Sequence, residues 1–322
     1  MTEPTISVAM CTFNGARFLP EQLQSIALQT LQPSELVICD DGSTDGTVGI
    51  LQSFALSARF LVRIFCNQET LGPAKNFEKA IGLCDGEIIS LCDQDDVWRP
   101  EKLARLQETL DAQPGAAYAF SDADMTGEDG EHLGMTAWDA VGLRKRVDRF
   151  VGAEQLNVLL RHNLIAGCSM AFRASLRGIF LPIPPTWMHD YWIVLLGSAL
   201  FQGTPVPERL YKYRRHANQV CGWRMKTFSQ VVSSSVETGQ EDCWKKIEQY
   251  REVLNRLATV QSSYPCEEGR LNLLKQKETH LLRRATARSS QGISRLFGVL
   301  AEASTGRYHR FSNSWYSIVR DL

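Results

Sequence analysis

The first part of the chain alternates between short apolar runs and longer segments in which apolar residues recur at helical spacing. This alternation is typical of an α/β protein, in which a mixed, mainly parallel sheet carries helices on both faces. Because such a sheet binds ligands beyond the carboxyl ends of its strands, the residues that follow each run are candidates for function. The runs that we predict as strands are Ile6–Cys11, Glu35–Asp40, Phe60–Cys66, Glu87–Asp93 and Ala117–Ser121.

The composition is that of a globular protein, with 322 residues of which 44% are hydrophobic and 22% charged. The longest nearly uncharged stretch in the middle of the chain, Tyr191 to Phe201, is too short to cross a bilayer. The nine cysteines never form a Cys-x-x-Cys pair, so their spacing predicts neither a disulfide framework nor a zinc site. We expect a cytoplasmic protein.

After residue 223 the pattern changes to amphipathic helices, so we expect two domains, 1–223 and 224–322. Residues 270–322 hold ten Lys or Arg and three acidic residues, a net charge of +7, with aromatic residues near the end. The helical region could cap the first domain, form a homodimer surface, or hold the protein at an anionic membrane or an acceptor. The sequence leaves these three roles open.

The densest acidic cluster follows the run that ends at Cys92 and consists of Asp93, Asp95 and Asp96 around Gln94. Three carboxylates this close at the end of a buried strand predict a divalent cation site, because hard cations prefer oxygen ligands. The alternative is an acidic turn that caps the helix beginning near Pro100.

Two more polar clusters would lie at the same edge of the sheet: Thr12 to Gly15 after the first run, and Asp40 to Thr47 after the second. Thr44 or Asp45 would cap the helix that follows. That role explains neither Asp40 nor Asp41.

Taken together, four motifs resemble the family 2 glycosyltransferases. These are Ser7–Asn14, Leu36–Asp45, Leu71–Asn76 and Asp93–Asp96. The resemblance covers residues 1 to about 220. It implies the GT-A fold, which is a nucleotide-diphosphate-binding α/β domain with a mixed central sheet, and transfer of a sugar with inversion.

The resemblance also implies roles for individual residues. Asp93-Gln94-Asp95 matches the family's Asp-x-Asp motif, in which the last carboxylate binds Mg²⁺ or Mn²⁺ and the first approaches the ribose or a metal-bound water. Phe13 as a core aromatic and Lys75 as a solvated helix residue are the alternatives to substrate binding. The side chains placed around the base and ribose are Thr12, Phe13, Asn14, Asp41, Lys75 and Asn76.

Downstream, His189-Asp190 precedes an apolar helical run. The resemblance implies that Asp190 is the catalytic base, which takes the proton from the acceptor hydroxyl. The alternative for Asp190 is a plain helix N-cap. For His189 we favour a packed core histidine.

The segment Tyr213–Asn218 resembles the part of the family in which a histidine completes the metal shell. This resemblance implies that His216 is a metal ligand together with Asp95. Arg214 or Arg215 would pair with the diphosphate, or lie solvated on the surface.

These features predict a metal-dependent inverting hexosyltransferase that adds a single sugar. Processive members carry Gln-x-x-Arg-Trp, where this chain has Gln219–Trp223 without that arginine. Cys92–Trp98 together with His189-Asp190 resembles bacterial rhamnosyltransferase-type members, so dTDP-rhamnose is the first donor expected and a UDP-hexose the next. The acceptor would be a hydroxyl of a growing surface polysaccharide, such as an O-antigen, or of a lipid-linked glycan. No nucleic-acid partner is expected.

The sequence argues against two other functions. A sugar-phosphate nucleotidyltransferase needs a Gly-rich loop with Lys or Arg after the first strand, and Thr12–Arg17 is not such a loop. A non-catalytic scaffold that binds a nucleotide sugar would lack the metal or base carboxylate, whereas Asp95 and Asp190 are both present.

Overall fold

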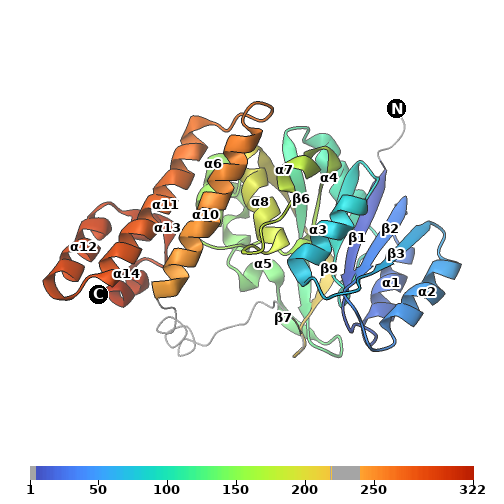
Figure 1. The fold of residues 1–322 in the computed structure, drawn as a ribbon. Coiled ribbons are helices and arrows are strands. Elements are labelled where there is room, and N and C mark those ends of the chain that lie inside the picture. The colour runs from blue at the N-terminus through green and yellow to red at the C-terminus, as the bar shows by residue number, and fades with distance from the viewer. Residues whose placement is uncertain (1–4, 218, 220–239) are drawn as a thin grey trace. The chain divides into compact units, whose positions relative to one another are not determined.

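The computed structural model describes residues 5–217, 219 and 240–322. The chain divides into two compact units (Figure 1). The first comprises Met1–Val151, Leu164–Gly197 and Phe201–Trp223, and the second Gly152–Asn163, Ser198–Leu200 and Arg224–Leu322. The predicted boundary between residues 223 and 224 and the Gln219–Trp223 motif beyond Gln219 lie outside the described residues, as does Asn218.

The first unit contains a mixed sheet of nine strands among the described residues, in the order β3-β2-β1-β4-β8-β6-β9-β5, with β7 beside β6. β1 pairs in parallel with both β2 and β4, and β2 with β3. β8 runs antiparallel to β4 and β6, while β9 is parallel to β6 and antiparallel to β5. The strands are β1 (Ile6–Thr12), β2 (Glu35–Asp40), β3 (Leu61–Cys66), β4 (Ile88–Cys92), β5 (Val97–Trp98), β6 (Ala116–Thr126), β7 (His132–Thr136), β8 (Met170–Arg173) and β9 (Gln202–Arg214).

Helices cover both faces of this sheet, as the alternating pattern predicts. α3 packs on one face of β1 and β2, while α1, α2 and α4 contribute to the core on the other. The helices of this part of the chain are α1 (Leu19–Ala27), α2 (Thr47–Ser57), α3 (Pro73–Leu83), α4 (Lys102–Ala112), α5 (Ala137–Ala140), α7 (Arg177–Phe180) and α8 (His189–Leu200), with 3₁₀ turns η1 (Arg144–Arg149), η2 (Gly167–Ser169) and η3 (Ala174–Leu176).

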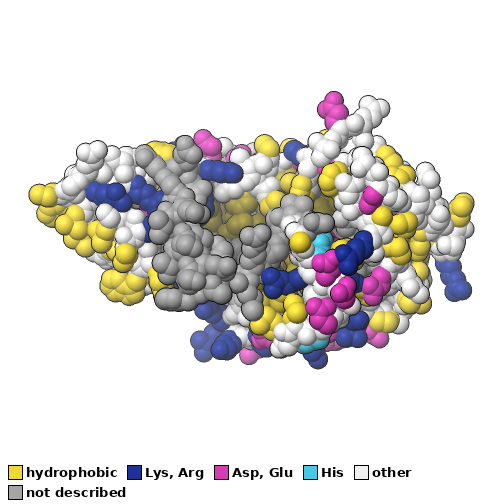
Figure 2. All heavy atoms as spheres, turned by 90° about the horizontal axis from the view of Figure 1, so that it is seen from below, with side chains coloured by type: hydrophobic (Ala, Val, Ile, Leu, Met, Phe, Trp, Pro, Cys, Tyr) yellow, Lys and Arg dark blue, Asp and Glu magenta, His cyan; other side chains and the backbone are white. Residues whose placement is uncertain are grey.

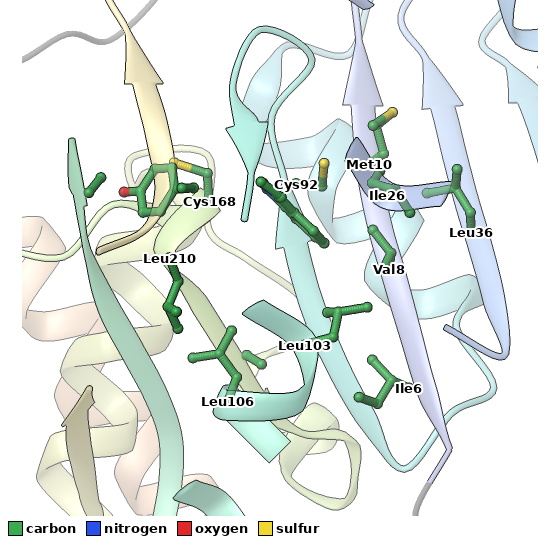
Figure 3. Packing of buried hydrophobic residues seen from close by; sticks show 14 of the residues in the cluster. Ile6, Val8, Met10, Ile26, Leu36, Cys92, Leu103, Leu106, Cys168 and Leu210 are labelled. Atoms are coloured by element: carbon green, nitrogen blue, oxygen red, sulfur yellow. The ribbon is translucent and has the colours of Figure 1, made fainter. Parts of the chain in front are cut away.

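The core on the α1 face follows from the period of two in the strands. Figure 3 shows Val8 and Met10 of β1 beside Leu36 of β2, with Ile26 of α1 packed close to them. All four side chains are buried. Because α3 packs against β1 on the opposite face, that face is largely buried as well, which is why the run is mostly apolar.

The topology sets the position of the site. β2 lies on one side of β1 and β4 on the other, so the connections after β1 and β4 leave the sheet next to each other. The apolar residues from Cys168 to Phe172 do not all belong to a strand, because residues 167–169 form η2 and β8 begins only at Met170. Cys168 is thereby removed from the ladder and turned into the buried core below the site (Figure 3).

The second unit is helical. Its helices are α6 (Gly152–Leu159), α10 (Gln240–Val260), α11 (Glu268–Ser289), α12 (Gly292–Ser304), α13 (Arg307–Phe311) and α14 (Trp315–Asp321). The sequence analysis placed α6 in the first domain, but its contacts group it with the C-terminal helices. Tyr250 Oη donates to Leu160 O at 3.2 Å, and Arg161 Nε to Arg310 O at 2.7 Å. Among the described residues, no helix is both long and apolar enough to span a membrane.

Candidate active site

The loop after β1 is tied to the acidic loop after β4 by Gln94. Its Oε1 accepts a hydrogen bond from Phe13 N at 2.8 Å, and its Nε2 donates to Phe13 O at 3.0 Å. A Cβ on Gly15 would lie 2.2 Å from the same Oε1, so only glycine leaves room for this contact. The middle residue of the Asp-x-Asp triplet therefore fixes the spacing of the two loops, a role that the sequence analysis missed.

The loop after β2 is tied to the loop after β1 in the same way. Asp40 Oδ2 accepts from Thr12 Oγ1 at 2.7 Å, and Asn14 Oδ1 accepts from Thr44 N at 2.8 Å. The N-cap of α2 is Gly46, and it makes no side-chain capping bond, so the expectation that Thr44 or Asp45 caps this helix is wrong. Asp45 Oδ1 accepts instead from Thr47 N at 2.9 Å. Thr12 and Asn14 thus hold the loops together, and their contact with a nucleotide stays a prediction.

Asp41 and Asn76 lie in a buried polar network at the edge of this loop. Asp41 accepts from Leu71 N at 2.8 Å, from Gly72 N at 2.9 Å and from Asn67 Nδ2 at 2.7 Å. Asn67 Nδ2 also donates to Asn76 Oδ1 at 2.9 Å. The network explains why a carboxylate is needed at position 41, because it accepts the backbone N–H groups of the turn that leads into α3.

Two of the predicted substrate-binding side chains are more accessible. Phe13 is 47% exposed, so the alternative that it is a core aromatic is wrong. Lys75 is partly exposed and pairs with Glu78 at 2.8 Å on α3. Both side chains lie on loops or helix ends beyond the carboxyl ends of the strands.

Beneath the loops, Asp96 is buried and Asp93 is half-buried. Burial, together with the carboxylates of Asp95 and Asp190, raises the pKa of Asp93 to about 7. Burial, with Asp95 and Asp93, holds the pKa of Asp96 well above its usual range. Asp96 Oδ1 accepts from Arg214 N at 3.3 Å, whereas its Oδ2 has no partner among the described residues. Asp190 is distant from Asp93 in the sequence but lies close enough in the structure to raise the pKa of Asp93.

The acidic turn does not cap the next helix. The N-cap of α4 is Glu101, and it makes no side-chain capping bond. The helix instead contributes Lys102, whose Nζ donates to Cys168 O at 2.5 Å and lies 4.0 Å from the centre of the Trp98 ring. Burial lowers the pKa of Lys102 to about 8, an effect opposed by Cys168, Cys92, Asp96 and Asp93. A buried ammonium thus offsets part of the acidic charge, although in the sequence Lys102 resembles any solvated helix residue.

The structure brings together the two predicted metal ligands. His216 Nε2 lies 2.8 Å from Asp95 Oδ2, although 121 residues separate them in the chain. Their side chains are only 8% and 14% exposed. Two ligands of one octahedral cation at about 2.1 Å each lie about 3 Å apart, so this pair fits Mg²⁺ or Mn²⁺. The ring of Phe18 packs 4.7 Å from that of His216 and supports its orientation.

A second group of possible ligand atoms lies deeper. Atoms of Asp93, Asp96 and Cys168 are all within 4.8 Å of one another. Burial, with the charges of Asp96 and Asp93, raises the pKa of Cys168 far above its usual range, so it stays a thiol. A neutral thiol is a poor ligand for a hard cation, and we therefore favour Asp95 and His216 as the metal ligands.

Asp190 lies in the first turn of α8, where the N-cap is Met188 and not Asp190. The N-cap alternative is therefore wrong, and Asp190 Oδ1 accepts instead from Tyr191 N at 2.6 Å. The neighbouring His189 stacks on Phe77 with ring centres 3.9 Å apart, and burial lowers its pKa to about 3. His189 is the packed, neutral core histidine that the sequence analysis favoured.

The sequence predicts that Arg214 pairs with the diphosphate or lies solvated on the surface, but the structure shows it bonded within the protein. Its guanidinium is buried, and it donates to Asp95 O at 3.0 Å and to Glu128 O at 2.8 Å. It also forms an ion pair with Glu21. Arg214 thus supports the backbone of the acidic loop, and the partly exposed Arg215 is left as the candidate for a diphosphate.

Comparison with known proteins identifies the family. The model of glycosyl transferase family 2 matches residues 7–180, which is more than half of the chain. The chain belongs to glycosyltransferase family 2. Uncharacterised proteins of Mycobacterium bovis and Mycobacterium tuberculosis are 28% identical to this glycosyltransferase over 221 residues. The match covers 67% of this chain and about 60% of the length of these relatives.

Solved structures share the fold of this glycosyltransferase. Staphylococcus aureus TarS, residues 1–349 in complex with UDP-GlcNAc, superposes with a TM-score of 0.61 at 15% identity, over 98% of this chain and 88% of that one. A mannosyltransferase from Pyrobaculum calidifontis, in complex with GDP-Man and Mn²⁺, gives 0.53 at 16% identity, over 100% and 86%. The predicted GT-A fold is confirmed.

Proposed function

We propose that this family 2 glycosyltransferase moves a single sugar, with inversion and with a divalent cation, from a nucleotide-diphosphate donor to a hydroxyl of a growing surface polysaccharide or lipid-linked glycan. The observation that carries this proposal is that Asp95 Oδ2 and His216 Nε2 lie 2.8 Å apart next to the half-buried Asp93, whose pKa is also raised by Asp190. Residues 1–223 would form the catalytic domain.

Asp95 and His216 would hold the cation, which when bound offsets the negative charge that develops on a leaving diphosphate. Asp190 would take the proton from the acceptor hydroxyl while that oxygen attacks the anomeric carbon on the face opposite the diphosphate. The new glycosidic bond forms as the bond to the diphosphate breaks, so one base and one bound donor suffice for inversion.

The donor class is supported by the structural neighbours, which hold UDP-GlcNAc and GDP-Man. The exposed ring of Phe13 offers a face for a nucleobase, and Asp41 and Asn76 would support the turn next to it. For the sugar itself, dTDP-rhamnose is the first candidate and a UDP-hexose the second.

The test is a donor panel with Mn²⁺ or Mg²⁺, followed by nucleotide release and by calorimetric binding. We expect metal-dependent release from one donor. Asp95→Asn should abolish metal-dependent nucleotide binding. Asp190→Asn should keep binding and lower turnover by roughly 10²–10⁴-fold, the usual range for a general base.

The control is Asp111→Asn, which removes an exposed carboxylate at the end of α4 and should change neither quantity. Binding of a donor without any turnover would favour the scaffold function instead. If no nucleotide sugar binds in the presence of metal, the proposal is wrong in its donor class.

A further inference from the structure

The C-terminal helices expose apolar side chains on one face of each of two helices. On α12, Ile293, Leu296, Phe297 and Leu300 are exposed, and their spacing of three, four and seven residues places them on one side. On the opposite side of α12, Val299 and Glu302 are buried. An amphipathic helix with its apolar stripe turned outward needs a partner outside the unit.

The last helix repeats this arrangement. Trp315, Tyr316, Val319 and Leu322 at the end of the chain are exposed, while Ser317, Ile318 and Asp321 are buried. α12 and α14 contact each other, so the two stripes lie on neighbouring helices. In Figure 2, yellow side chains gather at the left of the view, on the side where α12 and α14 lie in Figure 1, with basic side chains nearby. We call these eight exposed residues the C-terminal apolar face.

The exposed charged side chains of residues 290–322, which surround this face, are all basic. Residues 290–322 contain two acidic residues, Glu302 and Asp321, and both are buried in ion pairs. Glu302 pairs with His280 and Arg307, and Asp321 with Arg284 and Arg288. No acidic side chain of the described residues 290–322 therefore reaches the surface, whereas His309 and Arg310 are exposed.

We propose that the C-terminal apolar face docks on an anionic membrane surface, with the aromatic and aliphatic side chains at the headgroup boundary and the basic residues on the phosphates. Trp and Tyr favour this boundary, and Lys and Arg are drawn to anionic headgroups. Of the three roles that the sequence leaves open for the C-terminal region, the surface supports this one best. The proposal concerns binding and does not depend on the identity or activity of the donor site.

A second copy of the chain is a poorer occupant on electrostatic grounds. A symmetric dimer pairs a patch with itself, so the cationic edges of two such faces would meet without an exposed acidic side chain from α12 or α14 to compensate them. An anionic bilayer supplies the opposite charge instead.

The test is flotation of the full chain with two kinds of vesicle, pure phosphatidylcholine and equal parts of phosphatidylcholine and phosphatidylglycerol. We expect binding to the anionic vesicles, weakened by salt. The double variant Phe297→Asp, Trp315→Asp places charges at two positions that are each 68% exposed, and should lower partitioning tenfold or more. Arg310→Gln should lower it about fivefold.

The matched control is Leu56→Asp on α2, where the side chain is 92% exposed, and it should bind vesicles like the unaltered chain. Circular dichroism and donor binding should be unchanged in all variants, which separates this test from that of the transfer reaction. Equal binding by the double variant would overturn the proposal, as would no binding to anionic vesicles. A concentration-dependent dimer that the double variant dissociates would assign the face to a second copy instead.

Discussion

At the scale of single residues, the acidic cluster is arranged so that two carboxylates, Asp93 and Asp96, are costly to ionise. Asp93 is half-buried beside Asp95 and near Asp190, and its pKa is raised to about 7. An unfolded Asp titrates near 3.9. The folded protein therefore binds a proton between about pH 4 and 7 that the unfolded chain releases, so the stability contributed by protonated Asp93 is lost as pH rises through about 7.

We predict that, without divalent cations, Asp93→Asn is more stable than the unaltered chain at and above pH 7. The expected gain is on the order of 1 kcal/mol, or about 2–4 °C in the thermal midpoint, and it should shrink toward pH 4. Thermal unfolding across this pH range measures it. Asp111→Asn should keep the pH dependence of the unaltered chain. Parallel curves for Asp93→Asn and the unaltered chain would show that Asp93 is not the buried titrating group.

How much of the site could be predicted differs from residue to residue. Asp95 and Asp190 stand at positions of recognisable sequence motifs, so both can be proposed as site residues from the sequence. The structure places Asp190 near Asp93. The role of Lys102 could not be predicted from the sequence. Its charge is buried because Trp98 and the Cys168 carbonyl pack against it, and only the tertiary structure shows this packing. For the same reason, the sequence does not show that Arg214 donates a hydrogen bond to the backbone of the acidic loop.

At the scale of elements, the loops after β1 and β4 depend on one close contact. Gly15 allows Gln94 to approach the backbone and to form two hydrogen bonds with Phe13. Neither loop has regular secondary structure at this point, so these bonds set where Phe13 and the acidic residues lie relative to each other.

We predict that Gly15→Ala displaces the Gln94 amide, because its Cβ would lie 2.2 Å from Gln94 Oε1. Losing two hydrogen bonds should lower the free energy of unfolding by roughly 1–3 kcal/mol and weaken nucleotide binding. Urea unfolding and calorimetry measure the two effects. The control, Gly49→Ala on α2, has no atom within 4 Å of its new Cβ and should be neutral or stabilising.

A double-mutant cycle isolates the contact itself. In a Gln94→Ala background, Gly15→Ala should cost much less, because the atom with which it collides is gone. Additive losses from the two substitutions would place the cause elsewhere in the loop.

At the scale of the whole molecule, one apolar cluster of the helical unit consists of Tyr308 with Ala287, Val299 and Ile318. Buried polar groups supplement it. Asp321 accepts from Arg284 Nε at 2.5 Å, from Arg288 Nε at 2.7 Å and from Tyr308 Oη at 2.6 Å. One carboxylate thereby connects α11, α13 and α14.

We predict that Asp321→Asn destabilises α11–α14 by about 3–5 kcal/mol, because it leaves two buried guanidinium groups without their counter-ion. Trypsin cleavage mapped by mass spectrometry should show new sites in 268–322, while the unit that contains the sheet stays resistant. Glu268→Gln, which changes an exposed acid in the first turn of α11, is the control and should cleave like the unaltered chain. An unchanged cleavage pattern for Asp321→Asn would show that the ion pairs add little.

The sequence by itself determined the α/β architecture, the strands that carry the site and the candidates at their ends, because hydrophobic periodicity and strand-end motifs are local properties of the chain. The tertiary structure decided which candidates meet. It placed His216 against Asp95 across 121 residues, buried Lys102 beside the acidic loop, and grouped α6 with the C-terminal helices. Burial and contacts between distant segments set these features, and neither is encoded in the spacing of residues along the chain.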